Sequence, residues 1–260
     1  MDSKINAATA QIEVSVLMYH SISNSSGPTS IPVETFRAQI KTLRECGYRT
    51  VSLADFTAWL SAEKRLEGRS VVITFDDGFA DFADSAFPIL RDHNFTAAVF
   101  VPSGKIGQAE DWEGTNTAEA RRLMNWAQVA DLASQGIEFG GHSVSHTDLT
   151  RLSMTDLHHE VRRCRDELEQ HTARPVIAFA PPFGRAHIRE REEIRKWFAV
   201  SFGTQLERAR PGCDQFDVPR IEMHYFRDVK RWRDFLQGRG AVYFTARRAL
   251  RGLKQAIAGV

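Results

Sequence analysis

The sequence predicts an α/β fold in which a parallel sheet of seven strands is wound nearly into a barrel. Seven apolar runs have the length and composition of buried parallel strands, and helix-periodic segments lie between most of them. Strands and helices in alternation indicate a parallel sheet, and seven repeats in about 210 residues approach a barrel. With 260 residues, of which 42% are hydrophobic, the chain can bury one large core, so we expect a single domain.

The expected elements follow one another along most of the chain. The apolar runs are 14–20, 71–77, 96–102, 137–142, 176–182, 199–204 and 217–224. The helix-periodic segments are 34–46, 81–91, 126–134 and 155–171. Polar stretches at 21–32 and 103–121 are rich in Gly, Ser and Thr, so we expect loops there.

Composition sets further bounds on function and location. The formal net charge of +1 argues neither for nor against nucleic acid, and no recognisable nucleic-acid-binding fold accompanies the basic segments, so we expect no such partner. The three cysteines lack a CxxC pair, which favours reduced thiols. The first residues contain no apolar stretch of signal-peptide length, and no segment is long and apolar enough to span a membrane, so we expect a cytoplasmic protein.

Two polar motifs lie at ends of predicted strands, where parallel α/β folds carry out their chemistry. In VVITFDDG, Asp76 and Asp77 are like charges that lose hydration and repel, so they need a cation or a raised pKa. In GGHSVSHTDL, His142 and His146 are four residues apart and can face one ion. Asp77 and the two histidines form a set typical of a catalytic metal site, which leaves Asp76 free as a base. The alternatives are a loop-holding carboxylate and a helix-surface histidine pair.

These motifs resemble those of the polysaccharide deacetylase family, also called carbohydrate esterase family 4. TFDDG at 74–78 and HSVSH at 142–146 are similar to its first two motifs, 125–153 to its second-motif region, and FAPPFGR at 179–185 to its third. The resemblance covers roughly residues 14–225. It implies a distorted (β/α)₇ barrel and hydrolysis of N-acetyl groups on N-acetylhexosamine units of a polysaccharide, oligosaccharide or lipid-linked sugar precursor.

The resemblance also implies roles for individual residues. Asp77, His142 and His146 would hold a divalent cation, with Zn²⁺ expected first and Co²⁺, Ni²⁺ or Fe²⁺ also compatible with the ligands. Asp76 would be the general base, and the backbone N–H of Phe183 would stabilise the oxyanion. Its neighbours Pro182 and Gly184 would complete this substrate-binding segment. Hydrolysis of a non-sugar amide or formyl group, or glycan binding without catalysis, are the alternative functions.

The sequence departs from the family pattern in its third motif. Ala180 stands where many members have an arginine that orients the base. Arg185 and Arg220 are the candidates to replace it. Arg220 lies in a strand pattern, where a buried guanidinium would need a carboxylate such as Asp76. A salt bridge elsewhere is the alternative for both.

The general acid and the aromatic substrate contact are also open. His20 and His224 both end predicted strands and could protonate a leaving group. We prefer His20, because the first strand should lie beside the aspartate strand. Either histidine could instead be satisfied by backbone hydrogen bonds. Trp112, in a loop, could stack on a sugar ring, whereas Trp126 is expected to pack in its helix.

The basic C-terminal segment forms a separate region of the sequence. We assign residues 12–225 to the barrel and 226–260 to a basic amphipathic helical tail. From Tyr243 onward, Ala246, Leu250, Leu253 and Ile257 keep one helical face apolar. We expect this stripe to pack on the barrel. Peripheral contact with an anionic membrane is the alternative.

Overall fold

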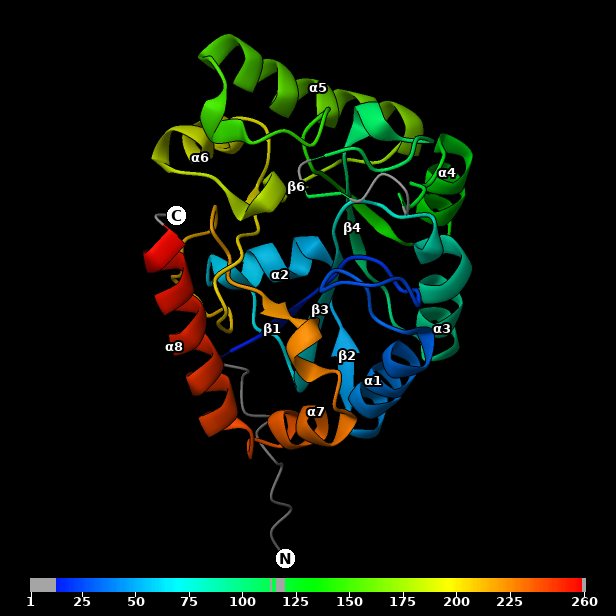
Figure 1. Ribbon diagram of the computed structural model, residues 1–260, viewed down its shortest axis with the longest axis vertical. Coiled ribbons are helices and arrows are strands. Elements are labelled where there is room, and N and C mark those ends of the chain that lie inside the picture. Colours follow the sequence, from blue (N-terminus) through cyan, green and yellow to red (C-terminus); the bar gives the residue numbers. More distant parts are fainter. Residues whose placement is uncertain (1–12, 113, 116–119, 259–260) are drawn as a thin grey trace, which may run out of the picture.

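One curled parallel sheet lies at the centre of the molecule, and helices lie around it (Figure 1). This computed structural model describes residues 13–258 apart from 113 and 116–119. The strands are β1 (Ser15–Tyr19), β2 (Tyr48–Thr50), β3 (Arg69–Phe75), β4 (Ala98–Val101), β5 (Glu138–Gly141), β6 (Ala178–Phe179), β7 (Val200–Ser201) and β8 (Ile221–Glu222). Their order is β7-β6-β5-β4-β3-β1-β8, and β2 pairs with β3 outside this order.

The two ends of the sheet meet through a short contact. Phe202, just after β7, forms a parallel bridge with Val218, which precedes β8. The N–H groups of Gly203 and Val218 donate to the carbonyls of Val218 and Ser201, each at 2.9 Å. The sheet is therefore a distorted barrel, as the resemblance predicts.

The helices match the sequence prediction in part. They are α1 (Val33–Glu45), α2 (Leu53–Leu60), α3 (Phe87–Asp92), α4 (Trp126–Ser134), α5 (Met154–Thr172), α6 (Ile188–Arg195), α7 (Val229–Leu236) and α8 (Ala241–Ala258). The predicted helix at 81–91 is divided, because the π-helical turn Phe82–Ala86 runs into α3. The expected loop at 103–121 begins with a 3₁₀ turn at Ser103–Lys105. The strand β2 and the helices α2 and α6 are not among the predicted elements, whereas α7 and α8 both fall within the predicted helical tail.

The inner face of the barrel has its own apolar cluster. Side chains alternate along each strand, so in β3 Val72 belongs to this inner cluster while Val71 and Ile73 pack with the outer helices. Helix α2 supplies Phe56 and Trp59 to the inner cluster, and the Phe56 ring stacks on an inner-facing phenylalanine. Apolar side chains of the short helix α2 therefore contribute to the barrel interior, and the polar site lies at the carboxyl ends of the strands.

Close packing inside the barrel makes Gly140 a sensitive position. A Cβ atom on Gly140, in β5, would lie 2.4 Å from ring atoms of Phe100 and 2.9 Å from the carbonyl oxygen of Ala178. We expect Gly140→Ala to lower the free energy of unfolding by about 2–3 kcal/mol, because the core must shift to admit the methyl group. Urea denaturation measures this change.

The control for this prediction is Gly136→Ala. Gly136 has a φ of 93° and nothing within 4 Å of the added Cβ, so only backbone strain of about 1 kcal/mol is expected. Equal destabilisation by the two substitutions would contradict the role of packing at Gly140.

The C-terminal helix α8 lies along the outside of the barrel (Figure 1). Tyr243 Oη donates to the carbonyl oxygen of Tyr225 at 2.7 Å. The Phe244 ring lies 5.1 Å from the ring of Phe235 in α7. These contacts join the first turn of α8 to the segment that follows β8.

The predicted apolar stripe of α8 is only partly tested. Ala246 and Leu250 are exposed, contrary to the expected packing of the stripe, because Tyr243 and Phe244 make the contacts instead. The side chains of Leu253 and Ile257 lie outside the described residues, as do the two ends of the assigned regions, 12 and 260. Among the described helices, none has the length and apolar character required to cross a membrane. Membrane contact stays a prediction.

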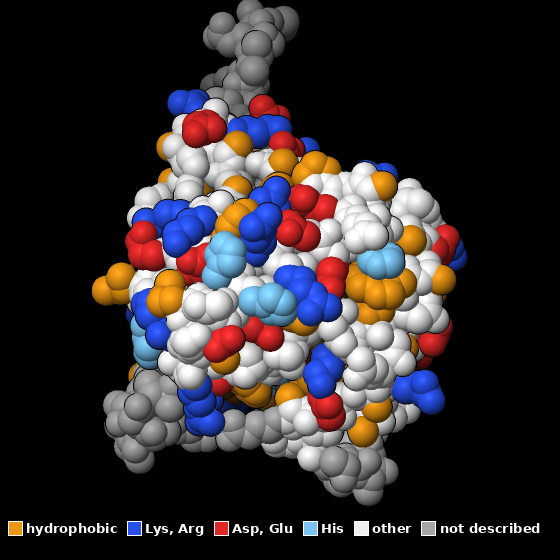
Figure 2. Space-filling model, turned by 90° about the horizontal axis from the view of Figure 1, so that it is seen from above, with side chains coloured by type: hydrophobic (Ala, Val, Ile, Leu, Met, Phe, Trp, Pro, Cys, Tyr) orange, Lys and Arg blue, Asp and Glu red, His pale blue; other side chains and the backbone are white. Residues whose placement is uncertain are grey.

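The face that carries α5 and α6 has mixed charge. Figure 2 shows Lys and Arg side chains interspersed with Asp and Glu side chains over this face. In α5, three arginines pair with carboxylates four residues later, with N–O distances of 2.7–3.4 Å. Such pairs suit a solvated helix face.

Candidate metal and catalytic site

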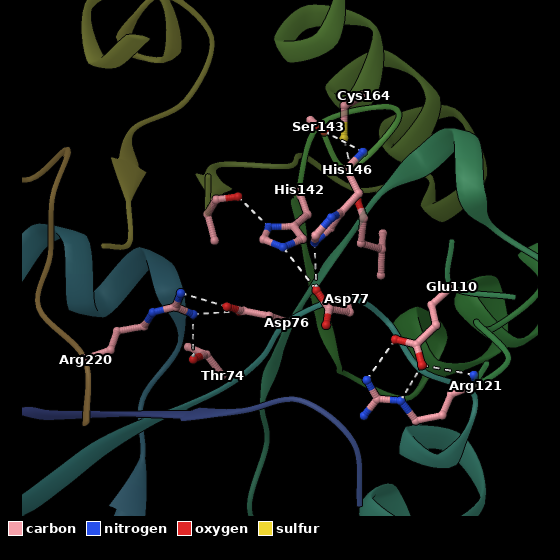
Figure 3. Close-up of polar contacts among 12 residues, drawn as sticks. Thr74, Asp76, Asp77, Glu110, Arg121, His142, Ser143, His146, Cys164 and Arg220 are labelled. Atoms are coloured by element: carbon pink, nitrogen blue, oxygen red, sulfur yellow. Dashed lines mark hydrogen bonds and ion pairs between the residues drawn. The ribbon is translucent and has the colours of Figure 1, made fainter. Parts of the chain in front are cut away.

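The two adjacent aspartates after β3 are directed to different partners. The backbone N–H of Asp76 donates to the carbonyl of Tyr19 at 2.9 Å, which continues the pairing of β3 with β1. Asp77 then has a φ of 72°, a left-handed conformation that turns the chain. Figure 3 shows the carboxylate of Asp76 pointing to Arg220 and that of Asp77 pointing to His142 and His146. The change in backbone direction separates the two charges.

Asp77, His142 and His146 form a compact buried cluster. Asp77 Oδ1 lies 3.3 Å from His142 Nε2 and 3.1 Å from His146 Nε2. One donor atom from each residue lies within 4.8 Å of the others. His142 follows β5, and its N–H donates to the carbonyl of Val101 at 3.1 Å. The structure thus brings together the three residues predicted as metal ligands.

The loop from His142 to His146 is not helical. Ser143 and His146 have φ values of 63° and 58°, and the N–H of His146 donates to Ser143 Oγ at 2.9 Å. Glu160 of α5 accepts hydrogen bonds from the N–H groups of Val144 and Ser145 at 2.8 and 2.9 Å. This carboxylate, which the sequence analysis missed, holds the loop so that both imidazoles face Asp77.

The donor atoms fit a divalent cation. His142 Nδ1 donates to the carbonyl oxygen of Ala180 at 2.5 Å, so in the neutral ring the lone pair of Nε2 faces Asp77. Burial lowers the pKa of His146 and favours its neutral form. Burial alone would raise the pKa of Asp77, but its contacts with His142 and His146 outweigh burial and hold the pKa well below its usual value. An ionised carboxylate and neutral imidazoles are the forms that bind zinc and related metals.

Arg220 holds Asp76 through a two-point contact inside the barrel. Its Nη1 and Nη2 atoms donate to Asp76 Oδ1 and Oδ2 at 2.6 and 2.8 Å. Its Nε donates to the carbonyl of Gly203 at 2.8 Å, and its side chain is fully buried. Burial alone would raise the pKa of Asp76, but the charge and hydrogen bonds of Arg220 leave it below the usual value. The predicted pairing of Arg220 with Asp76 is confirmed.

Arg185 has a different partner. Its Nη1 donates to Asp148 Oδ2 at 2.8 Å. Ala180, which stands in place of the family arginine, belongs to the inner apolar cluster. The guanidinium that faces Asp76 therefore comes from the segment before β8, not from the third motif.

One cavity of about 520 Å³ lies over both aspartates. Among the predicted residues, its lining includes Asp76, Asp77, His142, His146, His20, Trp112, Phe183 and Gly184. The Trp112 ring stacks on the His146 ring at a centroid distance of 4.0 Å, and the Phe183 ring meets the His146 ring in a T-shaped contact at 4.9 Å. Aromatic side chains thus lie beside the Asp77–His142–His146 cluster.

Three predicted site residues are absent from the described residues that line the cavity: Arg220, His224 and Pro182. Arg220 is buried and contacts Asp76. His224 belongs to the 3₁₀ turn Met223–Phe226, which carries it past the end of β8. Pro182 is buried, whereas the Phe183 side chain that follows it is exposed. Of the two histidines considered as acids, only His20 reaches the cavity, and β1 does lie beside β3 as expected.

A buried ion pair in the cavity wall was not predicted from sequence. Arg121 donates from Nε and Nη2 to the two carboxylate oxygens of Glu110 at 2.7 and 2.8 Å (Figure 3). Its guanidinium also lies 3.9 Å from the ring centroid of Phe79, and Nη1 donates to Ser30 Oγ at 3.1 Å. The pair joins the loop that carries Trp112 to the loop before α1.

We expect loss of the Glu110–Arg121 ion pair to lower the stability of the protein. Arg121→Met leaves Glu110 buried without its cation, so the free energy of unfolding should fall by about 3 kcal/mol. The double variant Glu110→Gln with Arg121→Met should recover part of that loss, because neither charge remains. Calorimetric unfolding of the three proteins measures both effects, and equal stability of the single variant and wild type would contradict the prediction.

The comparisons with known proteins agree with this geometry. The family model described as polysaccharide deacetylase matches residues 63–198. The protein YxkH of Bacillus subtilis (strain 168), whose name describes it as a polysaccharide deacetylase, is 26% identical to this chain over 213 residues. The match covers 82% of this chain and 70% of YxkH. The poly-β-1,6-N-acetyl-D-glucosamine N-deacetylase of Escherichia coli (strain K12) is 32% identical over 119 residues, or 44% of this chain but only 18% of that enzyme.

A solved structure supports the fold. The Streptococcus pyogenes deacetylase PplD in complex with acetate superposes with a TM-score of 0.71 at 24% identity, covering 81% of this chain and 92% of that one. At this identity the likeness establishes a shared architecture. The match of the family model to more than half of the chain goes further, because it covers Asp76 and the whole Asp77–His142–His146 cluster.

Proposed function

Because the chain belongs to the polysaccharide deacetylase family, we propose that it is a metal-dependent hydrolase that removes N-acetyl groups from N-acetylhexosamine units. The proposed substrate is a polysaccharide, an oligosaccharide or a sugar precursor. One observation carries the proposal: the Asp77–His142–His146 cluster and the Asp76–Arg220 pair line or adjoin a single cavity. The name of the Escherichia coli relative supports an N-acetylglucosamine polymer as the substrate class.

In this proposal Asp77, His142 and His146 hold a divalent cation, with zinc expected first. Such a cation supplies Lewis-acid chemistry, which polarises a carbonyl and eases deprotonation of water. Asp76 accepts the proton of the attacking water. Each carboxylate oxygen has two lone pairs and gives one to Arg220, so Asp76 can still accept.

The remaining steps fall to residues around the cavity. Phe183 has a φ of 60°, a strained conformation for a non-glycine residue, and we assign its N–H to the acetyl oxyanion. His20 is the proposed donor of a proton to the leaving amine, since it lines the cavity. Trp112 offers a ring face to the sugar.

Acetate release tests the proposal. Metal-loaded protein is incubated with β-1,6-linked N-acetylglucosamine oligomers and with a panel of small amides and formamides. We expect acetate from the oligomers only. Turnover of small amides or formamides alone would contradict the proposal and indicate a non-sugar substrate. Tight binding of the oligomers without turnover would indicate a glycan-binding member of the family that lacks catalysis.

A further inference from the structure

Helix α8 brings a cation to the cavity. Arg251 lines the same cavity as Asp77, His20 and Phe183, and its side chain is partly buried. The residues of α8 include no Asp or Glu, so no carboxylate of this helix can neutralise Arg251. A positive charge from the tail therefore lies beside the proposed reaction site.

The other arginines around this site are neutralised. Arg220 is paired with Asp76, Arg121 with Glu110, and Arg248, one turn before Arg251, with Glu207 at 3.0 Å. Within the part of the chain that the structure describes, Arg251 makes no ion pair or hydrogen bond. Glu222 lines the same cavity, but no ion pair joins it to Arg251 among the described residues. A guanidinium in a concave site favours an anionic partner, and a ligand in the cavity can supply it.

The position of Arg251 is set by the packing of α8. Tyr243 is bonded to the backbone at Tyr225, and the Arg248–Glu207 pair fastens the helix to the segment after β7. The guanidinium of Arg247 lies 5.3 Å from the Tyr225 ring centroid. These contacts begin two turns before Arg251 and extend to the preceding turn, so the helix presents this side chain to the cavity.

We propose that Arg251 recognises an anionic group, a phosphate or a carboxylate, on the sugar that is deacetylated. Guanidinium groups bind both anions through two parallel hydrogen bonds. The preferred substrate is then an acidic glycan or a sugar phosphate, and a neutral N-acetylglucosamine oligomer is a weaker one. This inference rests on the proposed function, because it places the anion on the same ligand as the acetyl group.

Binding to the metal-loaded protein tests the inference. Calorimetric titration compares N-acetylglucosamine with N-acetylglucosamine 1-phosphate and with an N-acetylglucosaminyl glucuronate disaccharide. We expect at least one anionic ligand to bind the wild type about tenfold more tightly than the neutral sugar. Arg251→Gln should remove this preference. Comparison of the titrations with the sugar phosphate and with the glucuronate disaccharide shows whether Arg251 prefers a phosphate or a carboxylate.

Arg44→Gln is the control, because it removes one positive charge at an exposed position of α1 that, in the described part of the chain, neither lines the cavity nor contacts α8. It should retain the preference, and any direct binding of the anion to the metal is common to all three proteins. Equal binding of neutral and anionic sugars by the wild type, or an undiminished preference in Arg251→Gln, overturns the inference.

Acetate assays separate this inference from the proposed function. Equal kcat/KM values for neutral and anionic sugars would overturn the role of Arg251 and leave the deacetylase proposal intact. An anion preference in binding without acetate release from any sugar would overturn the deacetylase proposal and leave Arg251 as an anion-binding residue.

Discussion

Asp77→Ala is expected to remove the bound metal and with it all acetate release. Asp77 Oδ1 faces both imidazoles at 3.1–3.3 Å, so it is the shared centre of the cluster. Loss of a directly bound carboxylate should weaken metal binding by more than about 100-fold, since outer-shell changes alone cost 10- to 100-fold. Elemental analysis after dialysis should show metal falling from about one ion per chain to almost none.

Two controls accompany the Asp77 experiment. His171→Ala removes a histidine that stacks on Trp126 away from the cluster, and it should leave metal content unchanged. Circular dichroism should show that Asp77→Ala keeps its secondary structure. If Asp77→Ala retained stoichiometric metal, the cation would have other ligands and the proposed site would be wrong.

Asp76→Asn is expected to keep the metal and lose about 10²- to 10⁴-fold in kcat, the usual contribution of a general base. The amide has almost the same shape as the carboxylate but cannot accept the proton. The measurement combines metal content with acetate release on an N-acetylglucosamine oligomer. Wild-type kcat in Asp76→Asn would contradict the role of Asp76 as base.

The Asp76–Arg220 ion pair makes Asp76→Asn a change in stability as well as in rate, so a second variant is needed to separate the two effects. Asp76→Asn leaves Arg220, whose side chain is fully buried, without a counter-charge, so the free energy of unfolding should fall by about 3–5 kcal/mol. The double variant with Arg220→Gln removes both charges and should recover stability without recovering rate. Recovery of rate together with stability would show that Asp76 acts through folding alone.

Arg220→Lys tests the positioning role of the guanidinium. Lysine keeps the charge but cannot make the two-point contact with Asp76 and the hydrogen bond to Gly203 together. We expect kcat to fall while KM and metal content stay close to wild type. A change in KM alone would assign Arg220 to substrate binding instead.

Local chemistry was sufficient to predict much of the site from the sequence. Buried parallel strands have a recognisable apolar composition, and polar residues that follow them must lie at one end of the barrel. Residue type and spacing alone therefore single out Asp76, Asp77, His142 and His146, and the third-motif gap at Ala180 raises the question that Arg220 answers. The short strand β2 and helix α2 escaped prediction because a few apolar residues have no distinctive period.

What the tertiary structure alone decided was how residues far apart in sequence meet. A left-handed φ at Asp77 sends neighbouring carboxylates to different partners, which no pattern of residue types encodes. The choice between Arg185 and Arg220 depended on which strand end carries a guanidinium into the barrel. The Glu110–Arg121 pair and the approach of Arg251 depend on how a long loop and a terminal helix pack. Sequence determines residue chemistry and local periodicity, whereas these contacts are set by packing across 11 to 144 positions of the chain.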